Sequence, residues 1–485
     1  MEKKSLLNIL ISFFLIISVL ILIYTHYKSH IIYDSNRVSH YIIYYIISLS
    51  GVLFFSSIYF LNESLKENII ISFITLIFLL YSTELIFNYL NLKKKNDVDI
   101  AKDRRLKRAE IILEKYGVEV DTRSQLEVHQ DLKKKGIDTH LLVTPYRMLG
   151  TDGILNYSWK EGQEKPKKFF PLSGSANKLT IGGAETGRYN IYKSDRYGFN
   201  NIDQEWDKKI NTVIIGDSAI HAAYLPVEQG WAGNFKKLTN KPVLSLGIGN
   251  NGHLLNLATL IEYGKSMKPN IVLWVYVEEN DLVELKNEIK SEILSKYLNE
   301  NFDQNLIEMQ DLIEKNYQIF VNKKIKENKI KETESELFSI ENKPSNKFLS
   351  FVKLTKLRNY LFYDLKLYFT SRITNKTLSD FEKVLVTAKK TTESFNGEFY
   401  FIYLPATTRY LEDYKYNLKD NDYYRDEVLD IVKKLKIPLI DLYELHFKNI
   451  EDPLSTLSFR MHSHYNQGTL QDISKVILDF LNKNN

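Results

Sequence analysis

The chain has 485 residues, and its 65 lysines and arginines against 60 aspartates and glutamates leave a net charge of only +5. This balance does not favour nucleic-acid binding, so no nucleic-acid partner is expected. Cysteine is absent, which excludes disulfides and cysteine-ligated zinc, and no histidine or carboxylate pair shows a convincing metal-ligand spacing. Neither a metal nor another cofactor is therefore expected.

The first hundred residues contain three long apolar stretches, at residues 6–24, 41–61 and 69–92. Each is long enough to cross a bilayer, which takes about 20 apolar residues, and short polar loops separate them. Three transmembrane helices are expected within residues 1–92, with the lipid bilayer as partner. A cleavable signal peptide is the weaker alternative for the first stretch. Glu84, inside the third stretch, is expected to face a neighbouring helix rather than to mark a functional site.

Three spans place the two ends of the chain on opposite sides of the membrane. Lys3 and Lys4 favour a cytoplasmic N-terminus, whereas the basic residues between 93 and 108 favour the reverse orientation. Because the first helix often dominates orientation, the domain after the membrane region is expected outside the cytoplasm, attached to the cell membrane.

Residues 93–205 form a predicted juxtamembrane region. Apolar residues recur at helical spacing over residues 101–116, with a basic opposite face, so this helix either lies against anionic headgroups or packs on the next domain. Residues 140–205 are rich in glycine, proline and turn residues and predict an irregular, partly β segment. Arg196 in this segment is expected in an internal ion pair rather than in a substrate site.

The most informative motif is the apolar run 213–215, which stops at Gly216-Asp217-Ser218. A short β-branched run followed by glycine predicts a buried parallel strand with a sharp turn, and residues 219–223 can open a helix behind the serine. A serine at such a strand end faces the crevice at the carboxyl edge of the sheet. Ser218 is therefore a candidate nucleophile, and an ordinary helix N-cap is the alternative.

Three later segments extend this motif into a pattern. Residues 246–252 follow a short apolar run, residues 271–281 end in Glu-Glu-Asn-Asp, and residues 462–468 read His-Ser-His-Tyr-Asn-Gln-Gly. Together with 213–218 they resemble, in order, the four blocks of the SGNH (GDSL-type) hydrolase superfamily, which carry a Ser, a Gly, an Asn and a His. A membrane-anchored group of this superfamily shares an Arg-x-His-x-His-Tyr-Asn pattern, which stands here at 460–466.

The resemblance implies a role for each matching residue. Ser218 would be the nucleophile and His464 its general base. The backbone N–H of Ser218 and the side-chain amide of Asn280 would hold the oxyanion. A backbone N–H of Gly249 or Asn250 would add a third donor, and the two fit the second block in different registers. A helix cap is the alternative for Asn280, and an ordinary turn residue is the alternative for His464.

One residue of the family pattern is missing. The superfamily usually places an aspartate two or three residues before the catalytic histidine, and Met461 and His462 occupy those positions here. The imidazole then lacks an obvious orienting acid, so the chain either uses a Ser-His dyad or takes an acid from elsewhere. Glu278 and Glu279 are candidates, although a solvated strand end is the favoured interpretation. Asp217 and His462 are further candidate supporting residues.

The resemblance implies a three-layer α/β/α fold with a parallel sheet of flavodoxin-like type over residues 206–485. Strands resume at 399–405 and 437–440 after a long, charged, helical stretch. Residues from about 284 to 375 are therefore an insertion. Because loops at the carboxyl ends of strands build the pocket, we expect the insertion to form a cap near the active site. A helical hairpin used for self-association is the alternative.

These features predict a membrane-anchored serine esterase that cleaves or transfers an acyl ester through an acyl-Ser218 intermediate. The expected substrate is an acylated envelope glycan or another ester. Two alternatives stay open. One is a catalytically inactive module that kept the fold, and the other is an O-acyltransferase whose partner is a membrane protein that donates the acyl group.

Overall fold

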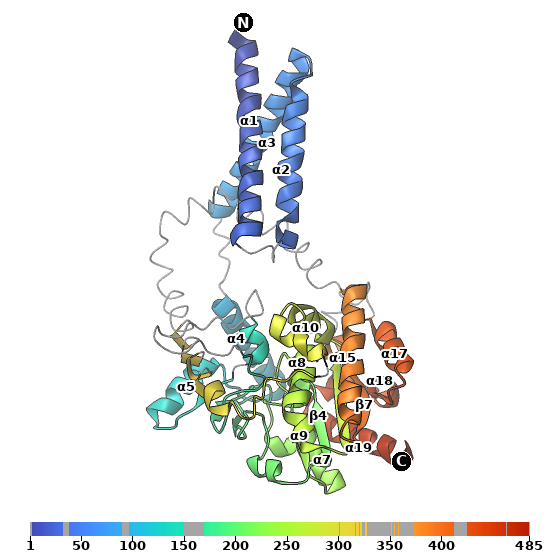
Figure 1. Cartoon of the computed structure of the whole chain (residues 1–485). Helices are drawn as coiled ribbons and strands as arrows, with labels where there is room; N and C mark the ends of the chain where they lie inside the picture. The colour runs from blue at the N-terminus through green and yellow to red at the C-terminus, as the bar shows by residue number, and fades with distance from the viewer. Residues whose placement is uncertain are drawn as a thin grey trace, which may run out of the picture. The chain divides into compact units, whose positions relative to one another are not determined.

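The computed structural model describes residues 2–32, 38–89, 97–142, 144–149, 169–299, 301–315, 373–411, 424–461 and 463–484, with single residues and short pieces between 317 and 357. The chain divides into two compact units (Figure 1). The first comprises Met1–Lys94 and Ile340–Thr370, and the second comprises Lys95–Ser339 and Ser371–Asn485.

The first unit is built on three helices, α1 (Glu2–His26), α2 (Val38–Ile58) and α3 (Glu63–Tyr89). The three helices lie side by side (Figure 1). They share a small apolar core that consists of Leu7, Ile11, Phe55, Ile58 and Ile70. Many other large apolar side chains on these helices are exposed, so the bundle presents an extended apolar surface.

Two helical stretches of this unit are long and apolar enough to cross a membrane, Leu6–His30 and Glu63–Phe87. Only 17% and 11% of their most apolar windows are buried, whereas the core helix of a soluble protein is mostly buried. Among the described residues two helices, not the predicted three, are long and apolar enough to cross a membrane, and the apolar part of α2 found there, Tyr44–Ile58, belongs among the shorter helices of 10–17 residues.

Glu84 on α3 is fully buried, as expected for a charged side chain that faces protein. One of its carboxylate oxygens accepts the backbone N–H of Leu357 at 2.8 Å. Close by on the same helix, the ring of Tyr81 lies 5.2 Å from that of Phe351. Leu357 and Phe351 come from the predicted insertion, so part of the insertion packs on α3 within the first unit.

The second unit contains a five-stranded parallel sheet. Its strands are β4 (Thr212–Ile215), β5 (Val243–Ser245), β6 (Ile271–Val277), β7 (Glu398–Leu404) and β8 (Leu439–Asp441). Their order across the sheet is β5-β4-β6-β7-β8. This is the flavodoxin-like order, in which the first strand lies between the second and the third. The predicted α/β class with a parallel sheet is confirmed.

Both faces of this sheet are buried, because successive side chains of a strand point to opposite sides. In β4, Val213 and Ile215 enter one apolar core and Ile214 enters the other. The helices on the first face include α8 (His253–Thr259) and α15 (Asn375–Glu393), and those on the second include α7 (Trp231–Thr239) and α19 (Gln467–Asn484). Because the strands are parallel, their carboxyl ends all lie at one edge of the sheet.

A smaller three-stranded sheet precedes the large one in the chain. Its strands are β1 (His140–Leu141), β2 (Leu179–Ile181) and β3 (Ile191–Lys193), with β2 in the middle. Before them the chain forms the helices α4 (Asp97–Tyr116) and α5 (Gln125–Lys134). Arg196, just after β3, forms ion pairs with Asp203 and Asp207, as predicted.

The first described part of the predicted insertion, up to Tyr317, contributes to a core of the large sheet. After β6 the chain forms α10 (Asp281–Glu288) and α11 (Glu292–Ser295). Leu306, Ile313 and Tyr317 then enter the core on the first face of the sheet and are at most 1% exposed. This part of the insertion does not form the predicted cap.

Candidate active site

Ser218 stands where β4 turns sharply into a short helix, α6 (Ser218–His221). Gly216 allows the turn, because a Cβ atom at this position would lie 2.5 Å from Ile220 Cγ1. The N-cap of the helix is Asp217, whose carboxylate accepts the backbone N–H two residues further on at 2.8 Å. The interpretation of Ser218 as an ordinary N-cap is therefore wrong, and its hydroxyl remains available for other contacts.

His464 lies beside Ser218, in the loop before α19. Its Nε2 is 2.7 Å from Ser218 Oγ. The imidazole stacks on the ring of Tyr224, with centroids 5.0 Å apart and an interplanar angle of 13°. The Tyr224 hydroxyl donates to the carbonyl oxygen of Tyr465 at 2.7 Å, and the Tyr465 hydroxyl donates to that of Pro405 at 2.9 Å. These contacts fix the loop that presents the imidazole to the serine.

A carboxylate lies on the other side of the imidazole. Glu185, between β2 and β3 of the small sheet, places Oε1 2.6 Å from His464 Nδ1, and its Oε2 accepts the His464 backbone N–H at 2.8 Å. Arg108 of α4 donates to the carbonyl oxygen of Glu185 at 3.3 Å. Sequence reasoning missed Glu185, because it precedes His464 by 279 residues and belongs to none of the four blocks.

Glu185 controls the proton affinity of His464. Burial lowers the pKa of His464, but the charge of Glu185 and its hydrogen bond outweigh burial and raise the pKa to about 9. Burial has the opposite effect on Glu185 and raises its pKa, but the charge of His464 and its hydrogen bonds outweigh burial and lower the pKa of Glu185 overall. The two groups therefore form an imidazolium–carboxylate ion pair at neutral pH, and the imidazole becomes a free base as the pH rises.

Asn280 lies close to Ser218, the candidate nucleophile. It occupies the N-cap position of α10, but its side chain makes no capping hydrogen bond there. Instead its Nδ2 donates to Asp217 Oδ2 at 3.2 Å, and the same oxygen is 3.2 Å from Ser218 Oγ. Gly249 is also near, since a Cβ atom on it would lie 3.7 Å from Ser218 Cβ. However, the Gly249 N–H already donates to His221 Nδ1 at 3.2 Å.

A pocket of about 360 Å³ opens in front of the Ser-His pair. Its lining includes the apolar side chains of Val277, Leu404 and Leu470 and the charged side chains of Arg108 and Glu279. A pocket of this kind, mostly apolar with a few polar groups, is typical of sites for small organic groups. Arg108 comes from α4, so the predicted juxtamembrane helix contributes directly to the site.

Asn250 points to a different neighbour. Its backbone has a left-handed φ of +65°, and its Nδ2 is 3.5 Å from Glu284 Oε1. Neither Gly249 nor Asn250 lines the pocket, and none of the described residues between 284 and 375 does so. The residues that line the pocket include ones from α4, the segment between β2 and β3, the carboxyl ends of the strands, the loop that carries His464 and α19.

The remaining predicted supporting residues differ in position. Glu278 is buried, forms an ion pair with Arg409 and accepts the Ala406 backbone N–H at 2.7 Å. It is therefore neither solvated nor placed beside the imidazole, because its carboxylate is committed to this buried network. Glu279 lines the pocket. His462 lies outside the described residues.

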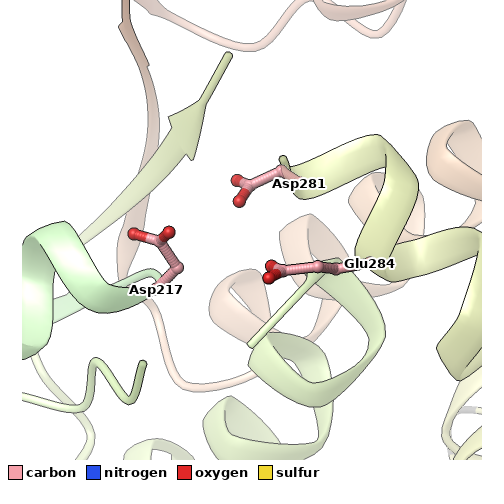
Figure 2. A group of neighbouring side chains, drawn as sticks. All are labelled: Asp217, Asp281 and Glu284. Atoms are coloured by element: carbon pink, nitrogen blue, oxygen red, sulfur yellow. The ribbon is translucent and has the colours of Figure 1, made fainter. Parts of the chain in front are cut away.

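Three buried carboxylates converge behind Ser218, those of Asp217, Asp281 and Glu284 (Figure 2). Each offers one oxygen, and these oxygens lie within 4.8 Å of one another. Burial and the neighbouring negative charges raise the pKa of both Asp281 and Glu284. Among the described residues, this group could hold a metal ion. No spacing in the sequence indicates it, since Asp217 follows β4 whereas the other two residues begin α10.

No family model matches the chain, and no curated protein matches it. Among solved structures, it is similar to the psychrotrophic esterase EstA from Pseudoalteromonas sp., in a structure inhibited by monoethylphosphonate. The two chains are 11% identical with a TM-score of 0.29, and the match covers 57% of this chain and 99% of that one.

Proposed function

We propose that the protein is a serine hydrolase that cleaves an acyl ester through an acyl-Ser218 intermediate. The observation that carries this proposal is the line of contacts from Ser218 Oγ to His464 Nε2 and from His464 Nδ1 to Glu185 Oε1, at 2.7 and 2.6 Å. A hydroxyl becomes a useful nucleophile when a base removes its proton, and the base works best when a third group orients it.

The chemistry follows from this arrangement. His464 Nε2 takes the proton from Ser218 Oγ while the oxygen attacks the ester carbonyl carbon. The tetrahedral intermediate collapses, the bond to the alcohol oxygen breaks, and the alcohol leaves with the proton from His464. Water then gives a proton to His464 and attacks the acyl carbon, which releases the carboxylic acid and restores Ser218.

The proposed oxyanion donors are the backbone N–H of Ser218 and the side-chain amide of Asn280. An amide nitrogen carries two hydrogens, and the bond to Asp217 uses one of them. The Asn280 side chain also forms a hydrogen bond with Glu284, so the amide would exchange one of these two partners for the negative oxygen of the tetrahedral intermediate. Preorganised donors of this kind stabilise the transition state more than the ground state.

Glu185 also bears on the choice between an enzyme and an inactive module. An inactive module would lack the acid that the family places before the catalytic histidine. Glu185 beside the imidazole supplies an orienting acid in addition to the proposed nucleophile and base, which supports catalytic activity. Acyl transfer would use the same acyl-Ser218, with a second alcohol in place of water.

We propose that the enzyme acts at a membrane, with Leu6–His30 and Glu63–Phe87 as its anchor. An acyl ester on a glycan is the narrower proposal for the substrate, and it rests on the resemblance to the SGNH superfamily. The side of the membrane depends on the number of crossings. Two crossings return the chain to the side of Lys3 and Lys4, whereas a third crossing through α2 would place the catalytic domain opposite them. A reporter fused after Asn485 distinguishes the two.

Turnover of a small acetyl ester by the purified full chain tests the proposed function. The wild type is expected to hydrolyse the ester, and Ser218→Ala and His464→Ala are each expected to lose nearly all of that activity while remaining folded. Equal activity per folded molecule in the wild type and Ser218→Ala would contradict the proposal.

A further inference from the structure

We propose that Asp217, Asp281 and Glu284 bind a divalent cation, Ca²⁺ or Mg²⁺, directly behind the nucleophile. Asp217 is the last residue before α6, and Asp281 and Glu284 stand in the first turn of α10. Residues three positions apart on a helix share one face. In Figure 2 the three carboxylates extend from these two elements toward the same space, and each has an oxygen within 4.8 Å of the others.

The charge of this group is not balanced by the protein. Asp217, Asp281 and Glu284 are 1%, 0% and 5% exposed. Among the described residues, no lysine or arginine forms an ion pair with any of them. His253 Nε2 lies 3.3 Å from Asp281 Oδ2. Because Trp274 Nε1 donates to His253 Nδ1 at 3.0 Å, the single proton of that imidazole is on Nε2 and the ring carries no charge.

Two oxygens of the group have no hydrogen-bond donor. Asp281 Oδ1 and Glu284 Oε2 are buried and unpartnered within the described structure. The other carboxylate oxygen of each residue has a partner. Asp281 Oδ2 accepts the backbone N–H of Val277 at 2.8 Å, and Glu284 Oε1 lies 3.5 Å from Asn250 Nδ2. A buried oxygen without a partner is costly and needs an explanation. A bound cation would satisfy both oxygens and cancel the charge at once.

The donor chemistry selects the class of cation. Carboxylate oxygens suit hard cations such as Ca²⁺ and Mg²⁺ better than the softer transition metals. Ca²⁺ holds its oxygen ligands at about 2.3–2.6 Å, so two ligands on opposite sides of the ion lie roughly 5 Å apart. Three oxygens within 4.8 Å of one another can therefore share one ion.

The cation would act as a positioning element for the proposed reaction. One oxygen of Asp217 caps α6, and the other contacts both Ser218 Oγ and the Asn280 amide. An ion bound to Asp217 and to the start of α10 would join the element that carries Ser218 to the one that carries Asn280. Removal of the ion should then loosen the nucleophile and an oxyanion donor together.

Calorimetric titration of the EDTA-treated full chain in detergent with CaCl2 and with MgCl2 tests the site. We expect binding of one ion per chain by at least one of the two cations, and a rise in melting temperature of roughly 2 °C or more at saturation. Asp281→Asn and Glu284→Gln should each weaken binding at least tenfold. Asp472→Asn, which removes an exposed carboxylate, should bind as the wild type does.

The contrary outcomes are equally specific. If protons rather than a cation neutralise the three carboxylates, the folded wild type will bind neither ion. The variants Asp281→Asn and Glu284→Gln will then melt at or above the wild-type temperature, and this result would overturn the proposal. Binding that both variants retain in full would also overturn the proposal. The wild-type titration stands even if a variant fails to fold. Because binding is measured by heat and not by turnover, the result does not depend on the proposed hydrolase activity.

Discussion

At the scale of single residues, the pairing of His464 with Glu185 sets the pH dependence. A general base must be neutral to accept a proton, and the pKa of His464 is raised to about 9. Activity should therefore rise with pH through the alkaline range. In Glu185→Gln the raising charge is lost while burial still lowers the pKa, so the midpoint should move at least one pH unit lower.

The same variant should also lose rate at its optimum, by roughly a hundredfold or more, because the imidazole is no longer oriented and its charged form is no longer stabilised. The measurement is kcat/KM between pH 5 and 10 for both proteins. An unchanged midpoint in Glu185→Gln would remove Glu185 from the mechanism.

Asn280 offers a second test at this scale. Asn280→Ala removes a proposed oxyanion donor, and the loss of such a donor typically lowers the rate by about a hundredfold to a thousandfold. The nucleophile stays in place, so slow labelling by a serine-reactive phosphonate should persist. Steady-state rates and labelling kinetics on the same preparation check this, and full wild-type turnover would exclude Asn280 as a donor.

At the scale of elements, α4 connects the two segments that flank the imidazole. Arg108 donates to the Glu185 carbonyl oxygen, and the Tyr116 hydroxyl donates to the carbonyl oxygen of Phe459 at 3.1 Å, just before the loop that carries His464. The amphipathic pattern of this helix is compatible with contact to either lipid or protein. The structure shows contacts with protein from the middle of the helix and from its C-terminal end.

Arg108→Gln should therefore lower kcat/KM by about tenfold, because hydrogen bonds from charged groups contribute about 1.5–3 kcal/mol and because the positive charge helps to keep Glu185 ionised. Arg104→Gln removes an exposed charge on the same helix and serves as the control. A fall in rate that is equal in both variants would show a general effect of charge instead.

The first described part of the insertion, up to Tyr317, belongs to the core of the second unit. Leu306→Ala should lower the free energy of unfolding by about 2–5 kcal/mol, as large-to-small changes in a packed core do. Ile319→Ala, at a site that is 55% exposed, should change it by about 0.5 kcal/mol or less. Urea titrations followed by tryptophan fluorescence measure both, and a small effect of Leu306→Ala would restore the idea of a separable cap.

At the scale of the whole molecule, local patterns in the sequence predict the sheet and two members of the site. Apolar runs define the strands, and the resemblance of the four motifs to those of the SGNH superfamily predicts that Ser218 and His464 share a crevice. Glu185 is beyond such reasoning, because a separate small sheet brings it to the imidazole and nothing in its local sequence marks it. The group formed by Asp217, Asp281 and Glu284 cannot be predicted locally either, because the fold brings its members together from two separate segments.

The most direct test of the central claim is the intact mass of the full chain after treatment with a fluorophosphonate. We expect one phosphonyl adduct per chain, mapped to Ser218 by peptide mass spectrometry, and labelling that becomes much slower in His464→Ala. Ser218→Ala should take up no adduct. An adduct on another residue, or none on a folded wild-type chain over the alkaline range in which His464 is neutral, would contradict the account.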